Sequence, residues 1–324
     1  MKKSLWMLGL AVAAMTSCTN EEVMEVAQNR AIGFNAFVNN NTKAITEVTN
    51  LTGFYVFGEF GDAAGTYGTQ VFKNEANTAI HYWQASKYYS FGAYANGDNT
   101  KIDKATFDAA TGTLTFPEYT PNDANDLVAA VKKLQSNSDV TANDPVDLTF
   151  GHMLSQVKFT FKTTDADAYT LKITELKIEG AASQATGEYN GTATWNTVQK
   201  NDGYAYAEIP DVAMAENDYT ASVARLVIPQ ANTNALKVTF KATVSGSGMA
   251  EKTATFTANL DYTAGGTPNT FDNTWTPGYR YNYIATINAD QIDPSLEHQK
   301  IEFTTSVTGW EDADNTDKGE LPKN

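Results

Sequence analysis

The sequence lacks most of the features on which enzymes and metal-binding proteins depend. Its 324 residues include one cysteine, so the chain cannot form an internal disulfide. A structural zinc site takes four Cys or His ligands, and the four such residues here are scattered along the chain, at Cys18, His81, His152 and His298. No G-x-S-x-G, H-E-x-x-H, Walker A or dinucleotide-binding motif occurs. We therefore expect no catalytic residues, no bound metal and no cofactor, and we interpret the histidines as strand-edge or surface residues.

Positive charge is also scarce. The chain has 23 Lys and Arg against 38 Asp and Glu, which gives a formal net charge of −15. A surface this acidic repels a phosphate backbone, so nucleic acid is not an expected partner. Hydrophobic residues make up 42% of the chain, enough for a sizeable core. A chain of this length predicts about two domains.

The N-terminal apolar run is short. Lys2 and Lys3 precede it, and it covers residues 5–14, too few for a membrane-spanning helix. The following Ala14-Met15-Thr16-Ser17-Cys18 resembles a bacterial lipobox, in which the cysteine is lipidated and becomes the first residue of the mature protein. This predicts residues 1–17 as a lipoprotein signal peptide and Cys18 as the lipidation site. A plain secretory signal that contains a cysteine near its end is the alternative.

Residues 18–30 are expected to be a tether between the lipid and the folded part. The acidic residues Glu21 and Glu22 resemble the surface-export signal of Bacteroidetes lipoproteins, or they are simply solvated. Arg30 is one of three arginines in the chain and lies between this tether and the first expected strand. Flexible segments at such positions are preferred sites of proteolysis. We predict processing between Arg30 and Ala31, with a lone surface arginine as the alternative.

Helical periodicity is nearly absent from the rest of the chain, and two-residue alternation of apolar and polar residues is frequent. Alternation of this kind gives a strand one core face and one solvent face, as in antiparallel sheets. Near residues 173–176 the alternation slips by one residue, which predicts a β-bulge. The segment 125–134 is either a helix or a buried strand. The expected strands are 31–38, 53–60, 87–94, 113–116, 146–150, 157–162, 204–209, 225–228, 236–244, 253–260, 279–287 and 301–307.

Turn residues separate these strands. Asn190-Gly191 and Pro277-Gly278 are examples, and many short strands with such punctuation predict β-sandwiches. The polar stretch Ser136–Pro145 precedes a new strand and then the longest alternating region. We therefore expect a domain boundary near Pro145, with one sandwich over residues 31–145 and a second over residues 146–324 that ends in an acidic tail.

Two features suggest binding sites. Four tryptophans, Trp83, Trp195, Trp275 and Trp310, form either a sugar-binding platform or part of the cores, where aromatic residues are usual.

The acidic segment 311–320 is either a calcium loop or a solvated tail. An EF-hand loop requires glycine at its sixth position and flanking helices, and here Asp317 holds that position after Asp312.

The order of motifs along the chain resembles the fimbrillin family of Bacteroidales, the lipoprotein-derived subunits of type V pili. The motifs that carry this resemblance are the lipobox, Arg30-Ala31 followed by the alternating 32–37, and the segments 53–57, 126–130, 148–159, 277–283 and 307–312. The resemblance covers most of the chain.

The resemblance implies a fold, a location and partners. The fold is all-β, with two transthyretin-like β-sandwich domains in tandem and mostly antiparallel strands. The location is the outer membrane and cell surface, reached through the lipid anchor, and the partners are other fimbrial subunits. In stalk subunits of the family an Arg-directed protease removes the N-terminal segment, and a strand from a neighbouring subunit fills the exposed groove. Arg30-Ala31 lies where that cut would fall.

We therefore expect a non-enzymatic structural or adhesive subunit of a fimbrium, with a receptor on a host or bacterial surface. The segment 311–324 lacks the alternating apolar residues of a donor strand, so a tip, accessory or anchor subunit is favoured over a stalk subunit. The alternative is a glycan-binding surface lipoprotein with a β-sandwich fold. A hydrolase is a third class, for which the sequence has no visible nucleophile–base pair.

Overall fold

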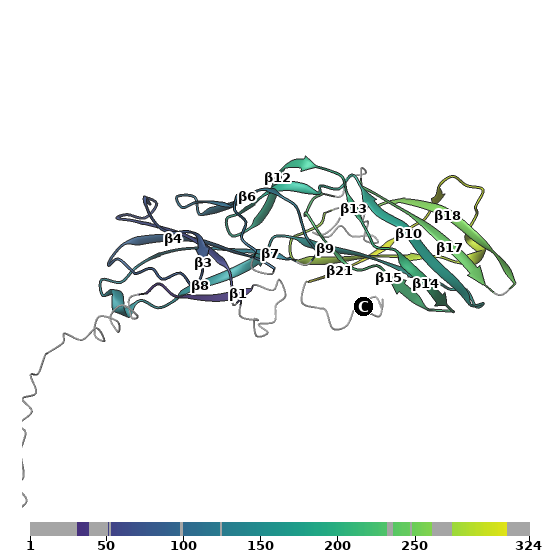
Figure 1. Cartoon of the computed structure of the whole chain (residues 1–324), viewed down its shortest axis with the longest axis horizontal. Helices are drawn as coiled ribbons and strands as arrows, with labels where there is room; N and C mark the ends of the chain where they lie inside the picture. Colours follow the sequence, from purple (N-terminus) through teal and green to yellow (C-terminus); the bar gives the residue numbers. More distant parts are fainter. Residues whose placement is uncertain are drawn as a thin grey trace, which may run out of the picture.

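The computed structural model describes residues 31–38, 51, 53–97, 100–123, 125–231, 236–246, 248–260 and 274–309. Within these residues the regular structure consists of β-strands and two short 3-10 helices, η1 (Val140–Ala142) and η2 (Ala289–Gln291). The strands form four sheets, arranged as two sandwiches that lie end to end (Figure 1). The predicted all-β class, with tandem sandwiches and mostly antiparallel pairing, is confirmed.

The first sheet has six strands in the order β1-β8-β7-β4-β2-β3. Their bounds are β1 (Phe34–Val38), β8 (Val146–His152), β7 (Leu127–Gln135), β4 (Tyr88–Asn96), β2 (Tyr55–Gly61) and β3 (Thr69–Ala76). Residues 125–134, which the sequence predicts as either a helix or a buried strand, thus lie mostly in strand β7. Its residues 127–130 are all buried, because this part of the sheet is covered on both faces.

This sheet curls so strongly that its two edge strands meet. Phe34 of β1 packs against Phe72 of β3 with ring centroids 5.4 Å apart, and against Phe91 of β4 at 5.6 Å. Phe54 completes the group, 6.1 Å from Phe34 and 5.3 Å from Phe150. The concave face of the sheet therefore encloses an aromatic core of its own.

The convex face of the first sheet is covered by a four-stranded sheet in the order β12-β11-β6-β5. Close packing between the two sheets requires a glycine at the centre of β4. A Cβ at Gly92 would lie 2.5 Å from the Phe107 ring, so any larger residue would push the sheets apart. The strands are β5 (Thr106–Asp108), β6 (Thr113–Tyr119), β11 (Gln184–Tyr189) and β12 (Ala193–Lys200).

The second sandwich is built around one core of buried residues that includes Trp275, Phe161 and Phe240. One sheet has the order β15-β9-β19-β21, with β16 also paired to β9; the other has the order β13-β10-β17-β18-β20, with β14 also paired to β10. The predicted β-bulge is present, because the pairing of β10 with β17 shifts between Thr174 and Lys177. The strands of the two sheets are β9 (Ser155–Lys162), β15 (Tyr219–Ala221), β16 (Arg225–Val227), β19 (Tyr279–Thr286), β21 (Thr304–Gly309), β10 (Tyr169–Glu179), β13 (Tyr204–Ala205), β14 (Ile209–Met214), β17 (Lys237–Gly246), β18 (Met249–Asn259) and β20 (Gln299–Lys300).

The strand pairing favours a boundary between the two sandwiches that lies later in the chain than Pro145. The stretch Ser136–Pro145 connects β7 to β8, which are neighbours in one sheet, and β8 also pairs with β1. Sheet membership changes after His152, at the start of β9. The reason is that a polar segment with turn residues joins adjacent strands as readily as it joins domains.

The chain then returns to the first sandwich. After β10 the hairpin β11–β12 pairs with β6, and the next strand, β13, pairs with β10 again. Arg225 Nε lies 2.9 Å from Asp123 Oδ2 across the joint, and within the first sandwich the Trp195 indole Nε1–H donates to the Met153 carbonyl over 2.7 Å. We propose that the first domain comprises residues 31–153 together with this hairpin.

Cutting the connection between β7 and β8 should leave the two pieces associated. The pieces 31–143 and 144–324 share the pairings β1–β8, β7–β8 and β6–β11, so separating them breaks both sheets of the first sandwich. The test is a specific protease site inserted after Asn143, followed by size-exclusion chromatography with and without urea. Co-elution without urea and separation in urea is the expected result. Separation without urea would contradict the shared sheets.

Stability should fall at alkaline pH because buried tyrosines resist ionisation. Burial raises the pKa of Tyr94 from 10.0 to about 12, against the opposing effect of hydrogen bonds with Ile102 and Asn74. The folded state therefore keeps a proton that the unfolded chain releases, so this contribution is complete below pH 10.0 and is lost as pH rises towards 12. Urea unfolding should show this decline, and Tyr94→Phe should make it shallower. An unchanged slope in the variant would contradict the assignment.

Candidate functional site at the edge strand

The three histidines do not come together. His81 Nε2 lies 2.6 Å from Glu75 Oε2, His152 Nδ1 lies 2.7 Å from Asp126 Oδ2, and His298 is exposed just before β20. Among the described residues, no group of three His, Cys, Asp or Glu side chains is placed to hold a metal ion. Each histidine therefore has to be interpreted in its own surroundings.

The pair of His152 and Asp126 fastens two strands of the first sheet. Asp126 directly precedes β7, His152 ends β8, and only 7% of the His152 side chain is exposed. Val128 and His152 are register partners, so the pair closes this end of the β7–β8 ladder. Burial and, to a lesser degree, Asp126 raise the pKa of the nearby Tyr119 hydroxyl. Two of the family-like segments, 126–130 and 148–159, thus meet in space and have a structural role.

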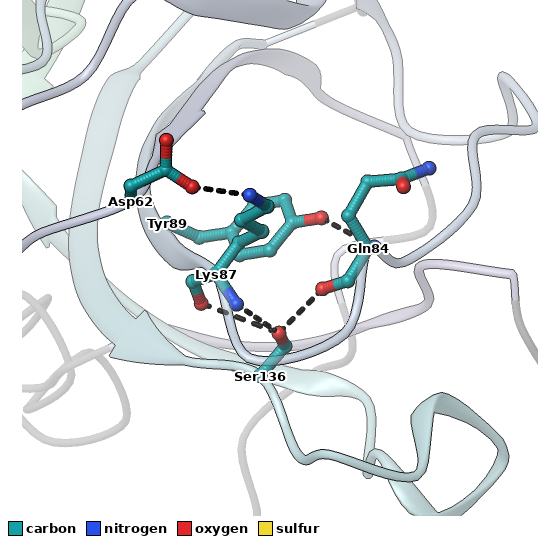
Figure 2. Close-up of polar contacts among 5 residues, drawn as sticks. All are labelled: Asp62, Gln84, Lys87, Tyr89 and Ser136. Carbon is teal, nitrogen blue, oxygen red and sulfur yellow. Dashed lines mark hydrogen bonds and ion pairs between the residues drawn. The ribbon is translucent and has the colours of Figure 1, made fainter.

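A second polar cluster combines a serine, a lysine and a tyrosine (Figure 2). Ser136 Oγ accepts from the Lys87 backbone N–H over 2.9 Å and donates to the Gln84 carbonyl over 2.6 Å. The Tyr89 hydroxyl accepts from the Gln84 N–H, and the Lys87 ammonium group contacts Asp62 instead of the serine. The serine thus lacks the base that a nucleophile needs. The cluster fixes the turn before β4 to the end of β7.

The three described tryptophans, Trp83, Trp195 and Trp275, do not form an exposed platform. Trp83 and Trp275 are buried, one in each sandwich, and Trp195 is half-buried at the joint, while Trp310 lies outside the described residues. Packing in the cores therefore explains the described tryptophans. Cys18, Arg30 and the acidic segment 311–320 also lie outside the described residues.

Strand β1 is the feature with the clearest potential for assembly. It lies at the edge of the first sheet and pairs in parallel with β8 through five residue pairs, from Phe34–Val146 to Val38–Phe150 (Figure 1). Ile32, Phe34, Ala36 and Val38 belong to or pack against the enclosed core, whereas the outward Asn35 is exposed and Phe37 is 39% exposed. The strand therefore covers apolar surface with alternate side chains and, among the described residues, has one strand neighbour.

The position of β1 in the chain suits exchange. Ala31, the residue after the predicted cut, forms an isolated bridge with Tyr82 just before the core-facing part begins. A short edge strand in a parallel pair is held by slightly weaker pairing than an antiparallel one. An edge also presents backbone groups to which another chain can add. We call the surface that β1 covers, formed by β8 and the enclosed core, the β1 groove.

The comparisons with known proteins agree with this architecture. A family model described as fimbrillin-like matches residues 19–310. The chain belongs to the fimbrillin-like family. This membership agrees with the resemblance carried by the motifs, and it covers both sandwiches. No curated protein matches the sequence.

Of three solved structures similar to this chain, one has a TM-score above 0.5 and the other two are more distant. A protein from Parabacteroides distasonis assigned to cell adhesion is 13% identical, with 87% of this chain and 97% of that one covered and a TM-score of 0.52. A protein from Bacteroides uniformis, also assigned to cell adhesion, is 17% identical, with 86% and 99% covered and a TM-score of 0.46. The fimbrial anchor protein Mfa2 from Porphyromonas gingivalis is 10% identical, with 86% and 98% covered and a TM-score of 0.36. The described residues contain no helix long and apolar enough to cross a membrane.

Two phenylalanines of β1 should differ sharply in their effect on stability. Phe34→Ala removes a ring that contacts three aromatic side chains, so it should lower the free energy of unfolding by about 3 kcal/mol. Phe37→Ala, on the outward face of the same strand, should change it by less than about 0.5 kcal/mol. Urea unfolding of both variants measures the difference. Equal effects would show that β1 does not anchor the enclosed core.

Proposed function

We propose that the protein is a structural or adhesive subunit of a cell-surface fimbrium, in the position of a tip, accessory or anchor subunit, and not an enzyme. Membership of the fimbrillin-like family supports the fimbrial role. The observation that carries the proposal is strand β1, which closes an aromatic core from a sheet edge with one strand neighbour. In this proposal the protein reaches the outer membrane as a lipoprotein attached through Cys18.

Assembly is proposed to proceed by replacement of β1. Processing at Arg30–Ala31 removes the lipid tether but leaves β1 in place, because the strand remains paired with β8 and packed through Phe34. Exchange therefore needs a second step in which β1 leaves and a strand of another subunit pairs with β8. The incoming strand needs apolar side chains at alternate positions, matching Ile32, Phe34, Ala36 and Val38.

The described C-terminal strand supports an accepting rather than a donating role. β21 pairs with β19 along its whole length. Phe303, just before it, packs against Phe159 with ring centroids 5.6 Å apart and against Tyr283 at 6.3 Å. Donating this segment would open the second sandwich and expose its core. The following segment 311–324 has no apolar alternation to donate.

A second segment of this chain, residues 301–307, has the alternation that a donor strand needs. Ile301, Phe303, Thr305 and Val307 repeat the spacing and nearly the residue types of Ile32, Phe34, Ala36 and Val38. A segment with this pattern fits the β1 groove if it leaves its own sandwich. Self-donation by residues 301–307 would make the protein a stalk subunit, so the experiment has to separate the two roles.

The test is to cleave purified protein with an Arg-specific protease, confirm Ala31 as the new N-terminus, and follow particle size by light scattering. We expect the cleaved protein to stay monomeric alone and to form larger particles with a different fimbrial subunit. Arg30→Lys is the matched control, since it keeps the charge and should block both cleavage and assembly.

Two outcomes would overturn parts of this proposal. Homopolymers of the cleaved protein would replace the tip, accessory or anchor role by a stalk role, and their loss in Phe303→Asp would identify residues 301–307 as the donor. No incorporation with any fimbrial subunit after complete cleavage would remove strand exchange from the function.

A further inference from the structure

A short surface segment crosses the beginning of β1 on the side away from β8. We call this segment, residues 79–83 between β3 and β4, the strap. Ala31 forms an antiparallel bridge with Tyr82, and the Ile32 N–H donates to the His81 carbonyl over 2.8 Å. Among the described residues, the strap provides the hydrogen bonding to this strand on that side. The start of the strand thus lies between β8 and the strap.

Side chains of the strap alternate between solvent and protein. Ile80 is 72% exposed and Tyr82 is 45% exposed, whereas Trp83 is buried in the enclosed core. The His81 ring turns inward and packs against Phe72 with centroids 4.4 Å apart. The strap is therefore a surface strip fixed to the sheet by the side chains of residues 81 and 83.

His81 connects the strap to β1 in two ways. Its backbone carbonyl binds Ile32 directly. Its ring contacts Phe72, which in turn packs against Phe34 of β1. The position of the ring is set by Glu75 of β3, whose Oε2 lies 2.6 Å from His81 Nε2.

The pair of His81 and Glu75 is placed so that it can open without opening the core. The two side chains are 30% and 37% exposed, so water reaches them in the folded state. A hydrogen-bonded pair this exposed contributes little to global stability. Its loss, however, removes the group that holds the His81 ring and carbonyl against the start of β1. Local opening of this kind can be much easier than global unfolding.

We propose that His81 and Glu75 form a latch that sets how fast β1 leaves its groove, and thereby regulates strand exchange. This inference rests on the exchange proposed above, with both residues acting as positioning residues for β1. A cut at Arg30–Ala31 then leaves the new N-terminus held by the strap, and release starts when the latch opens. The latch would keep the processed subunit from exposing its groove before a partner strand arrives.

The test is hydrogen–deuterium exchange of the uncut protein, read on peptides that cover residues 31–38. Glu75→Ala removes the hydrogen-bond partner of His81 and should speed exchange of the β1 amides roughly threefold to tenfold, because local opening becomes easier. His81→Phe keeps a ring against Phe72 without the hydrogen bond and should give a similar increase. Glu118→Ala is the control, since it removes an exposed pair with Lys104 far from β1 in the sequence and in another sheet. The urea midpoint should stay close to that of the wild type in all three variants.

Unchanged β1 exchange in Glu75→Ala, or equal acceleration by Glu118→Ala, would overturn the latch. A second measurement separates this failure from failure of strand exchange: a labelled peptide of residues 31–38 is added to protein cut after Arg30, and its incorporation is timed. Incorporation at one rate in all variants would support exchange and overturn the latch. Faster β1 opening in the latch variants with no incorporation of the peptide would support the latch on β1 and contradict exchange.

Discussion

The contact of Phe34 with Phe72 holds together the two edges of the same six-stranded sheet. Without it the concave face of the sheet would lie open, and the rings of Phe54, Phe91 and Phe150 would lose their cover. A sheet that curls this far uses its first strand as a closing element. This is why a five-residue strand with one strand neighbour matters for the whole first sandwich.

Under the proposed strand exchange, the same arrangement creates a conflict between stability and assembly. Burying an aromatic side chain on β1 stabilises the folded subunit, yet a strand that is to be replaced has to leave on a useful timescale. The attachment of β1 is divided between hydrophobic contacts and hydrogen bonding to the strap, which suits the proposed exchange. The hydrophobic contacts can be supplied equally well by another strand of the same alternation. The polar contacts at His81 are local and partly exposed, so they affect the rate of opening more than the stability of the core.

The joint between the sandwiches shows a different constraint, which is resistance to bending. The chain passes from the first sandwich to the second at β9, returns for the hairpin β11–β12, and crosses again to β13. Each crossing is a covalent connection, and the contacts of Arg225 and the Leu226 N–H with Asp123 add an ion pair and a hydrogen bond between the halves. An element of a surface filament benefits from such a joint, because a single flexible linker would let the two halves move independently.

The sequence alone predicts a structural element where the interactions that form the element lie between residues close together in the chain. Alternation predicts most strands, since one buried face imposes a two-residue period, and a slip in that period predicts the bulge near Glu175. The Asn190-Gly191 turn between β11 and β12 is a local signal of a hairpin, whereas residues 69–76 form a strand that alternation alone does not reveal clearly. The order of family-like motifs along the chain also indicates the fold class and the fimbrillin-like family.

The remaining features depend on which distant segments meet, and composition or periodicity does not encode that directly. The boundary that we propose lies after Pro145 because β8 pairs with β1, more than a hundred residues earlier in the chain. His152 and Asp126, and likewise His81 and Ile32, become neighbours only when their sheets form. The sequence by itself thus determined the strands, the turns and the family. The tertiary structure decided sheet order, the closing role of β1 and the strap that holds it, because these arise from pairing between residues far apart in the chain.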